Sequence, residues 1–177
     1  MRFVFLLLLF LSFSCATVGT KQATFKKVEH VYISPVTNKT NEEALDVIFS
    51  KIADDVFYSD PRFKVDHKPI PGTTIIVKPS VDSISTFAVG FDRQDRATEY
   101  KMTVQATVKL FRYGFKKPFK VFRITRYDFY SNVGDPLEIE RNRKECLSRI
   151  AEQIFSAVGE KLYAEGREIE SNPEIVK

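Results

Sequence analysis

The sequence predicts an α+β fold in which two helices pack on one face of a four-stranded mixed sheet, in the order β-α-β-β-β-α. Two patterns lead to this fold class. Residues 100–110 alternate strictly between apolar and polar side chains, which is typical of a strand with one buried face. Residues 41–58 and 137–164 repeat apolar side chains at steps of three and four, which is typical of amphipathic helices. All these elements fit in one domain, residues 28–166.

The first strand and the first helix have recognisable ends. The strand begins near Val28, and Pro35 ends it because proline cannot continue a hydrogen-bonded ladder. Thr40 and Glu43 then have the spacing of a capping box, which predicts the start of the helix. Pro61 closes that helix, since the residue before a proline is pushed out of the helical region.

Three more strands are expected between the helices. Residues 73–87 alternate less regularly, and Pro79 predicts that this strand lies at a sheet edge or contains an irregularity. A long polar hairpin tip, residues 88–97, connects it to the clear strand at 100–110. The fourth strand of the sheet covers residues 119–130.

The second helix is framed by residues typical of helix ends. Gly134 breaks the last strand, and Asp135 precedes Pro136, which gives an N-cap followed by proline at the first helical position. Gly166 is expected to end the helix. This leaves residues 167–177 as a flexible C-terminal tail.

The first residues have the organisation of an export signal. Arg2 precedes an apolar run at positions 3–13, and Ser12 and Ser14 provide the small residues that signal peptidases accept. A transmembrane helix needs about 20 apolar residues, so this run is too short to span a bilayer. Residues 1–14 are therefore predicted to be a signal peptide.

Cys15 would be the first mature residue, and bacterial lipoprotein processing attaches its lipid to a cysteine at that place. We therefore expect an N-terminal lipid anchor at Cys15, with fatty acyl chains such as palmitate, followed by a polar tether over residues 15–27. Ordinary secretion with cleavage at the same bond and no lipid is the alternative, because Ser12 stands where many lipoproteins have leucine.

The composition is that of a globular protein, with 44% hydrophobic and 28% charged residues. The net charge of +4 favours anionic partners only weakly, and the sequence has no basic stripe of the kind that binds nucleic acid. Cys15 and Cys146 are the two cysteines, and acylation of the first would leave no disulfide. Cys146 is expected to be a small buried or half-buried apolar side chain.

The sequence contains no catalytic or metal-binding pattern. His30 and His67 are the two histidines, and neither has the spacing of metal ligands. The seven glycines form neither a dinucleotide-binding nor a phosphate-binding loop, and the chain has no nucleophile elbow. We therefore expect a protein that is not an enzyme and has no cofactor and no metal site.

Recognition of an anion is the chemistry that remains. Arg93 and Arg96 lie in the predicted hairpin tip, and Arg141 lies at the start of the second helix with Arg143 and Lys144. Such groups bind phosphates through charge-assisted hydrogen bonds. Dispersed charge that keeps the surface hydrated is the alternative interpretation.

Several segments follow one another in a recognisable order. They are Val31–Val36, Asn38 with Thr40, Arg96–Met102 leading into Val104–Val108, Lys120–Arg123 and Ile150–Ile154. Together with the lipoprotein-type start, this order resembles the LptE family of lipopolysaccharide-assembly lipoproteins over nearly the whole mature chain.

The resemblance implies a lipoprotein attached through its N-terminal lipid to the outer membrane, on the periplasmic side. It implies a non-enzymatic plug inside the LptD-like β-barrel, where the protein supports barrel assembly and the insertion of lipopolysaccharide in the outer leaflet. It also implies binding of lipopolysaccharide: Arg93 matches the family's basic hairpin residue, Arg96 lies close by, and Arg141 is the nearest counterpart of a second basic site.

A second class of function stays open from the residues alone. An anchored lipoprotein could bind a small ligand or another envelope component in a pocket between the helices and the sheet. An apolar cavity lined by Phe49, Ile52 and Met102 is the expected place. A ligand that co-purifies with the chain would support this alternative.

Overall fold

The computed structural model describes residues 29–171, with side chains from residue 30 to residue 165. The predicted signal peptide, Cys15 and the predicted tether lie outside the described residues. The elements within that range are β1 Glu29–Ile33, β2 Thr37–Asn38, α2 Leu45–Ser59, β3 Phe63–Val65, β4 Thr74–Phe91, β5 Ala97–Arg112, β6 Lys120–Ser131 and α3 Pro136–Ser171.

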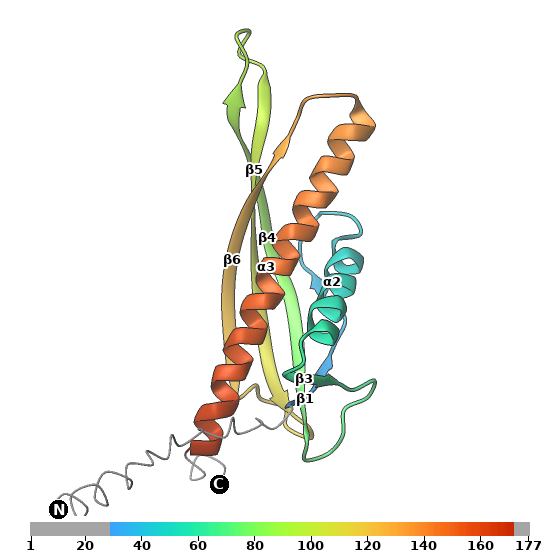
Figure 1. Cartoon of the computed structure of the whole chain (residues 1–177), viewed down its shortest axis with the longest axis vertical. Helices are drawn as coiled ribbons and strands as arrows, with labels where there is room; N and C mark the ends of the chain where they lie inside the picture. The colour runs from blue at the N-terminus through green and yellow to red at the C-terminus, as the bar shows by residue number, and fades with distance from the viewer. Residues whose placement is uncertain (1–28, 172–177) are drawn as a thin grey trace, which may run out of the picture.

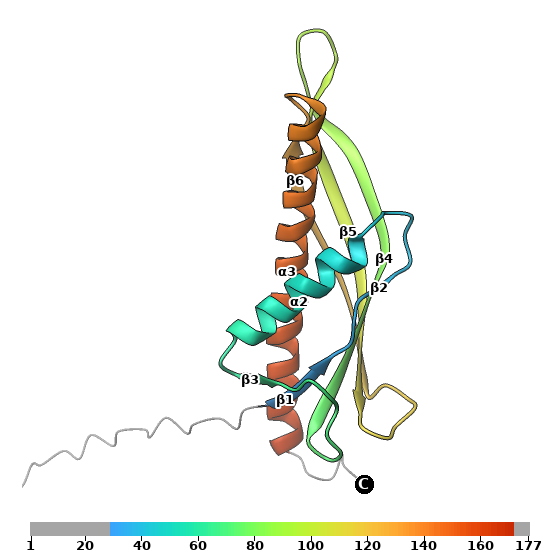
Figure 2. The ribbon, with the colours of Figure 1, turned by 90° about the vertical axis from the view of Figure 1, so that its right-hand side faces the viewer.

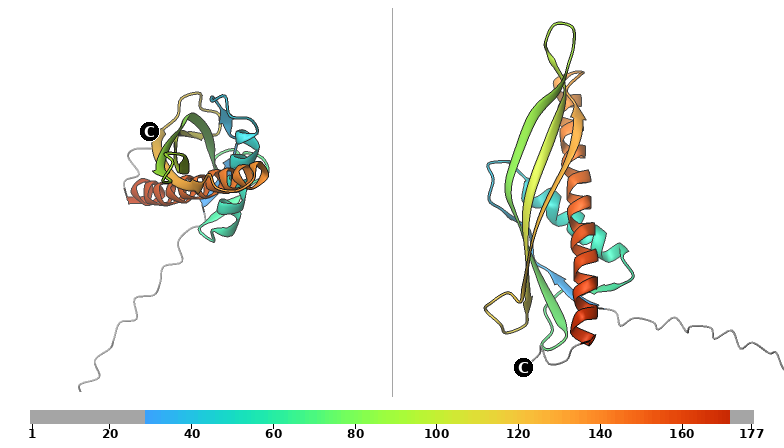
Figure 3. Two further views of the ribbon diagram at one scale, coloured as in Figure 1. Left: turned by 90° about the horizontal axis from the view of Figure 1, so that it is seen from above. Right: turned by 90° about the vertical axis from the view of Figure 1, so that its left-hand side faces the viewer.

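Within residues 29–171, six strands form one mixed sheet, in which β2 extends the path β3-β1-β4-β5-β6 beside β4. β4, β5 and β6 form a long antiparallel meander that twists along its length (Figures 1 and 3), whereas β1 runs parallel to both β3 and β4. The predicted α+β class is confirmed, with six strands in place of four. β2 and β3 have two and three residues, which is too short to produce a periodic pattern.

Pro79 lies in β4, which has neighbouring strands on both sides. β1 ends at Ile33 and β2 begins at Thr37, so at Pro79 the described part of the sheet has a break on that side. The carbonyls of Val77 and Val81 point to the same side and accept backbone hydrogen bonds there, at 2.9 and 3.0 Å. Backbone groups alternate in direction along a strand, so the backbone nitrogen of Pro79 faces the break. Its lack of an N–H therefore leaves no carbonyl of a neighbouring strand without a donor.

Both helices pack on one face of the sheet and close the core (Figure 2). Every second β5 side chain from Met102 to Leu110 is buried, as the alternation predicted. On the helices, Phe49 of α2 meets Phe155 of α3 edge to face, with ring centroids 6.3 Å apart. Burial of apolar surface at about 25 cal/mol per Å² makes this layer the main source of stability.

The first helix begins later than predicted, at Leu45, and its N-cap has no side-chain hydrogen bond. Thr40 instead belongs to a turn, in which its hydroxyl donates to the Asn38 side chain at 2.8 Å and accepts the backbone N–H of Glu42 at 3.2 Å. The predicted capping box of Thr40 and Glu43 is therefore wrong. Local hydrogen bonds from side chains offer this segment a turn that competes with the helix.

The second helix begins where it was predicted and ends later. The Asp135 carboxylate accepts two backbone N–H groups of the first turn, at 2.8 and 2.9 Å, which confirms the N-cap before Pro136. α3 then continues past Gly166, its predicted end, to Ser171. One glycine costs a helix only about 1 kcal/mol relative to alanine, so it does not force an end. The predicted tail, 167–177, is thus helical as far as Ser171.

Candidate anion-binding site

The β4–β5 hairpin ends in a short tip, residues 92–96, at one end of the elongated molecule (Figure 1). The two strands stay paired up to its base, so the tip is shorter than the predicted 88–97. Asp92 organises the turn, because its carboxylate accepts the backbone N–H of Gln94 at 2.8 Å and that of Arg96 at 3.0 Å. The tip is therefore a defined turn with its own internal hydrogen bonds.

The two arginines of the tip have different surroundings. Arg96 donates to the Asp92 carboxylate at 2.8 Å and to the Gln94 side chain at 3.3 Å. Hydrogen bonds, chiefly from the Arg96 backbone, lower the pKa of the Asp92 carboxyl. Arg93 is exposed, and its guanidinium has no hydrogen bond or ion pair to any described residue. Arg93 is thus available to an external anion, while Arg96 supports the turn.

The first turns of α3 lie at the same end of the molecule as the hairpin tip (Figure 1). Asn132, which follows β6, donates its backbone N–H and its side-chain amide to carbonyls of the first two β5 residues, at 2.8 and 3.1 Å. These bonds hold the β6–α3 connection against the base of the hairpin. The fold therefore places Arg141 at the same end as Arg93 and Arg96.

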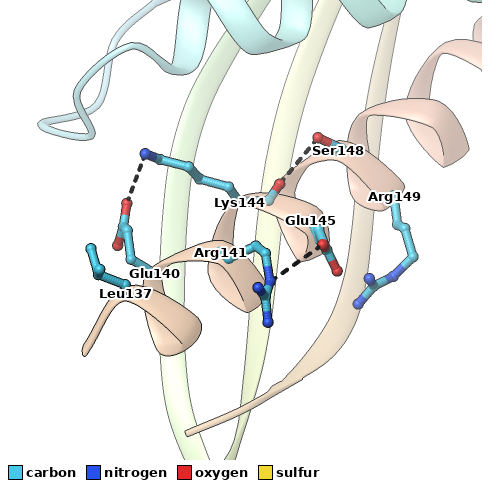
Figure 4. A pocket seen from close by; sticks show the side chains of 7 residues that line it. All are labelled: Leu137, Glu140, Arg141, Lys144, Glu145, Ser148 and Arg149. Carbon is cyan, nitrogen blue, oxygen red and sulfur yellow. Dashed lines mark hydrogen bonds and ion pairs between the residues drawn. The ribbon is translucent and has the colours of Figure 1, made fainter. Parts of the chain in front are cut away.

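Arg141 lines an open hollow of about 530 Å³ on the outward side of α3 (Figure 4). Its guanidinium lies 3.8 Å from the Glu138 carboxylate and 4.0 Å from the Glu145 carboxylate. Lys144 next to it pairs with Glu140 at 3.5 Å. An anion at Arg141 would compete with these carboxylates, so Arg141 is a weaker candidate than Arg93.

The open face of the sheet carries an aromatic patch that the sequence analysis did not identify. The patch consists of Phe87, Tyr127 and Phe129, which are 64%, 52% and 40% exposed. Phe87, Lys101 and Phe129 are direct neighbours across three strands, and the Lys101 ammonium lies 3.9 Å from the centroid of the Tyr127 ring. Alternation within each strand indicates which face a residue takes, but only the register between strands brings these four side chains together.

Two titratable side chains away from the hairpin tip, those of His30 and Asp66, make structural contacts. His30 lies 3.1 Å from the buried Asp66 carboxylate, to which the Thr74 hydroxyl donates at 2.7 Å. Burial raises the pKa of Asp66, but the hydrogen bonds from Thr74 and His30 outweigh burial and hold the pKa below its ordinary range. Cys146 is fully buried, as predicted. Across the part of the chain that the structure describes, no three His, Cys, Asp or Glu side chains gather as a metal site.

The residues predicted to line a ligand cavity lie in different surroundings. Phe49 and Met102 have no exposed surface and belong to the packed core. Ile52 lines an open groove of about 630 Å³ between α2 and α3, where most of the other lining residues are polar. The structure therefore does not gather the three side chains around one apolar cavity.

Comparison with known families shows to which protein family the chain belongs. The model of the LptE lipopolysaccharide-assembly family matches residues 28–161. The chain belongs to the LptE family. It is thus a lipoprotein of lipopolysaccharide assembly and envelope biogenesis, in a family that is non-enzymatic. No curated protein matches the chain.

Solved structures share the fold of this LptE-family chain. Rare lipoprotein B from Shewanella oneidensis has a TM-score of 0.53 at 11% identity, over 78% of this chain and 98% of that one. Lipoprotein B from Nitrosomonas europaea has a TM-score of 0.50 at 13% identity, over 82% and 90%. A protein from Xanthomonas campestris has a TM-score of 0.55 at 8% identity, over 83% and 90%. Neither helix of the described range has the length and apolar character needed to cross a membrane.

Proposed function

We propose that this LptE-family protein is the plug of the translocon that inserts lipopolysaccharide in the outer leaflet of the outer membrane. A lipid on Cys15 would attach the chain to that membrane on its periplasmic side. The folded body would sit inside an LptD-like β-barrel, support assembly of the barrel, and bind lipopolysaccharide at the hairpin tip.

The exposed guanidinium of Arg93, which has no partner among the residues that the structure describes, is the observation that carries the ligand assignment. Lipopolysaccharide presents phosphate groups, and guanidinium groups bind phosphates through paired, charge-assisted hydrogen bonds. Asp92 and Arg96 hold the turn beneath Arg93 through four hydrogen bonds to and from the tip. A preorganised turn loses less conformational entropy on binding than a free loop does.

Arg96 and Arg141 have supporting roles in this proposal. Arg96 keeps the tip in shape and adds positive charge beside Arg93. Arg141 adds charge from the start of α3, although Glu138 and Glu145 offset it. The tip also contains Asp92 and Asp95, so the exposed position of Arg93, and not an excess of positive charge, favours a phosphorylated ligand at this end.

The open face of the sheet fits a position inside a barrel. Its middle presents polar and charged side chains, among them Gln105, Lys109 and Arg123, and the interior of an outer-membrane barrel is polar. Nearer the hairpin, the aromatic patch of Phe87, Tyr127 and Phe129 supplies an apolar area, which a stable protein interface requires.

The test is isolation of the full chain from membranes in mild detergent, followed by identification of the proteins that accompany it. We expect a large β-barrel to co-purify with the natural chain, and to be lost when Phe87 and Tyr127 are both changed to serine. Val47→Ser is the matched control, since Val47 is 66% exposed on α2, away from the patch. Absence of any large barrel from the natural preparation would contradict the plug assignment.

A further inference from the structure

The end of the sheet opposite the hairpin tip carries a second exposed feature, the β5–β6 loop of residues 113–119 (Figure 1). Phe115 is 69% exposed and Tyr113 is 47% exposed on this loop. The loop begins with a defined turn. The Phe115 N–H donates to the Arg112 carbonyl at 3.1 Å, and Gly114 takes a φ of 83° that completes the turn. Two large apolar side chains are thus held outward.

The same loop has a net positive charge. It contains Lys116 and Lys117 and no carboxylate, and both lysines lack an ion pair within the described residues. Arg112, at its start, lies over the Phe119 ring at 5.5 Å, so this cation is held beside the loop. Exposed aromatic side chains next to unpaired lysines are the combination that binds at a membrane interface, where rings enter the headgroup layer and ammonium groups meet phosphates.

The chain enters the fold at this same end. His30 of β1 pairs with Thr74 at the start of β4, and the next β4 residue, Ile75, pairs with Arg112 at the end of β5. The β3–β4 loop lies beside them and exposes Ile70 to 45%. Residues 16–28 separate Cys15 from β1, and at about 3.5 Å per residue they span at most about 45 Å. A lipid on Cys15 would therefore keep this end within reach of the membrane surface.

We propose that the β5–β6 loop is a membrane-surface contact, which docks on anionic phospholipid headgroups of the leaflet that holds the chain. Phe115 and Tyr113 enter the interfacial layer, and Lys116 and Lys117 bind the lipid phosphates. The contact goes beyond the plug function, and it depends neither on a barrel nor on lipopolysaccharide. It fixes which end of the elongated molecule faces the headgroups, and so keeps the hairpin tip at the other end free.

The chain contains no tryptophan, so Phe115→Trp introduces a single fluorescent probe in the loop. The mature chain, which is cleaved before Cys15, is mixed with phosphatidylcholine vesicles that contain brominated lipid, with and without phosphatidylglycerol. We expect a blue shift and quenching of the tryptophan emission in the anionic vesicles. Val47→Trp is the matched control, because Val47 is 66% exposed on α2, away from the loop and from the aromatic patch, and its emission should not change.

Charge reversal tests the role of the lysines. Lys116→Glu with Lys117→Glu, in the Phe115→Trp background, should weaken the interaction at least about thirtyfold, since each lysine near an anionic surface contributes roughly five- to sixfold. Circular dichroism checks that the fold is retained. Unquenched emission in anionic vesicles, equal quenching of both probes, or indifference to the charge reversal would overturn the proposal. A shift that appears only when the barrel protein is added would also overturn it, and would assign the loop to a protein contact.

Discussion

Arg149 of α3 donates to the Asp128 carboxylate of β6 at 2.5 Å and to the Phe129 carbonyl at 3.0 Å. Tyr127 and Phe129 flank Asp128 in the strand but point to the other face of the sheet. The ion pair therefore holds α3 against the face of β6 that is opposite the aromatic patch. It couples the packing of the helix to the shape of the proposed barrel-contact surface.

Arg149→Ala should lower the free energy of unfolding by about 1 kcal/mol, because it removes one charge-assisted bond and one bond to a carbonyl at a half-exposed site. Urea denaturation measures the change. A double-mutant cycle with Asp128→Ala should give a coupling energy of about 0.5–1 kcal/mol. Arg141→Ala is the control with little expected change, since its ion pairs are long and exposed. A coupling energy of zero would show that the two groups act independently.

Asp82 lies at a bulge in β4 and is surrounded by donors. Thr107, Lys39 and Ser80 donate to its carboxylate at 2.5, 2.6 and 3.0 Å. Burial raises the pKa of this carboxyl, but the three hydrogen bonds outweigh burial and hold the pKa below its ordinary range. A carboxyl whose pKa is lower in the folded state stabilises the fold above its unfolded pKa, and this stability is lost as pH falls through the folded pKa.

We therefore expect the natural chain to lose stability below about pH 4, and Asp82→Asn to lose less over the same range. At neutral pH the variant should be less stable by about 1–2 kcal/mol, because Lys39 loses its charged partner. Denaturation measured at a series of pH values gives both quantities. Glu152→Gln, an exposed substitution on α3, should keep the full acid dependence. Equal acid dependence in Asp82→Asn would rule out this role of the carboxylate.

Cys146 should resist thiol reagents in the folded protein. Its side chain is fully buried, and burial raises the pKa of the thiol to about 11, so little reactive thiolate forms at pH 8. Alkylation followed by mass spectrometry should find the Cys146 peptide unmodified under native conditions and fully modified in urea. Rapid modification of the native protein would mean that α3 opens from the sheet far more often than its packing implies.

The sequence predicted those parts of the fold that depend on local periodicity or on a single cap. The strict alternation in β5 and the Asp135 N-cap are confirmed because each rests on neighbouring residues. β2 and β3 were not predicted, since they exist only through pairing with β4 and β1. The start of α2 was misplaced for a related reason: Thr40 had two compatible local structures, and the sequence pattern did not discriminate between them.

The position of the two arginines in a hairpin tip was predictable from the sequence, but the geometry of that tip was not. Arg93 and Arg96 were placed correctly in a hairpin tip. The turn that Asp92 makes decides that Arg96 is bound within the tip, whereas Arg93 has no partner among the described residues. The aromatic patch required the register of three strands, which a strand's own sequence does not determine. The patch thus depends on long-range strand pairing, and the different roles of the two arginines depend on the geometry of a local turn.

The two tip arginines should respond differently to substitution. Arg93→Ala should weaken binding of lipopolysaccharide by about tenfold, since a hydrogen bond to a charged group contributes about 1.5 kcal/mol, and should leave the melting temperature unchanged. Arg96→Ala should weaken binding less directly, through loss of the Asp92 ion pair at 2.8 Å, and should increase hydrogen exchange in residues 92–96. Arg123→Ala, an exposed arginine in the middle of the sheet, is the control for general loss of charge. Equal loss of affinity in all three variants would assign binding to net charge and remove the special role of Arg93.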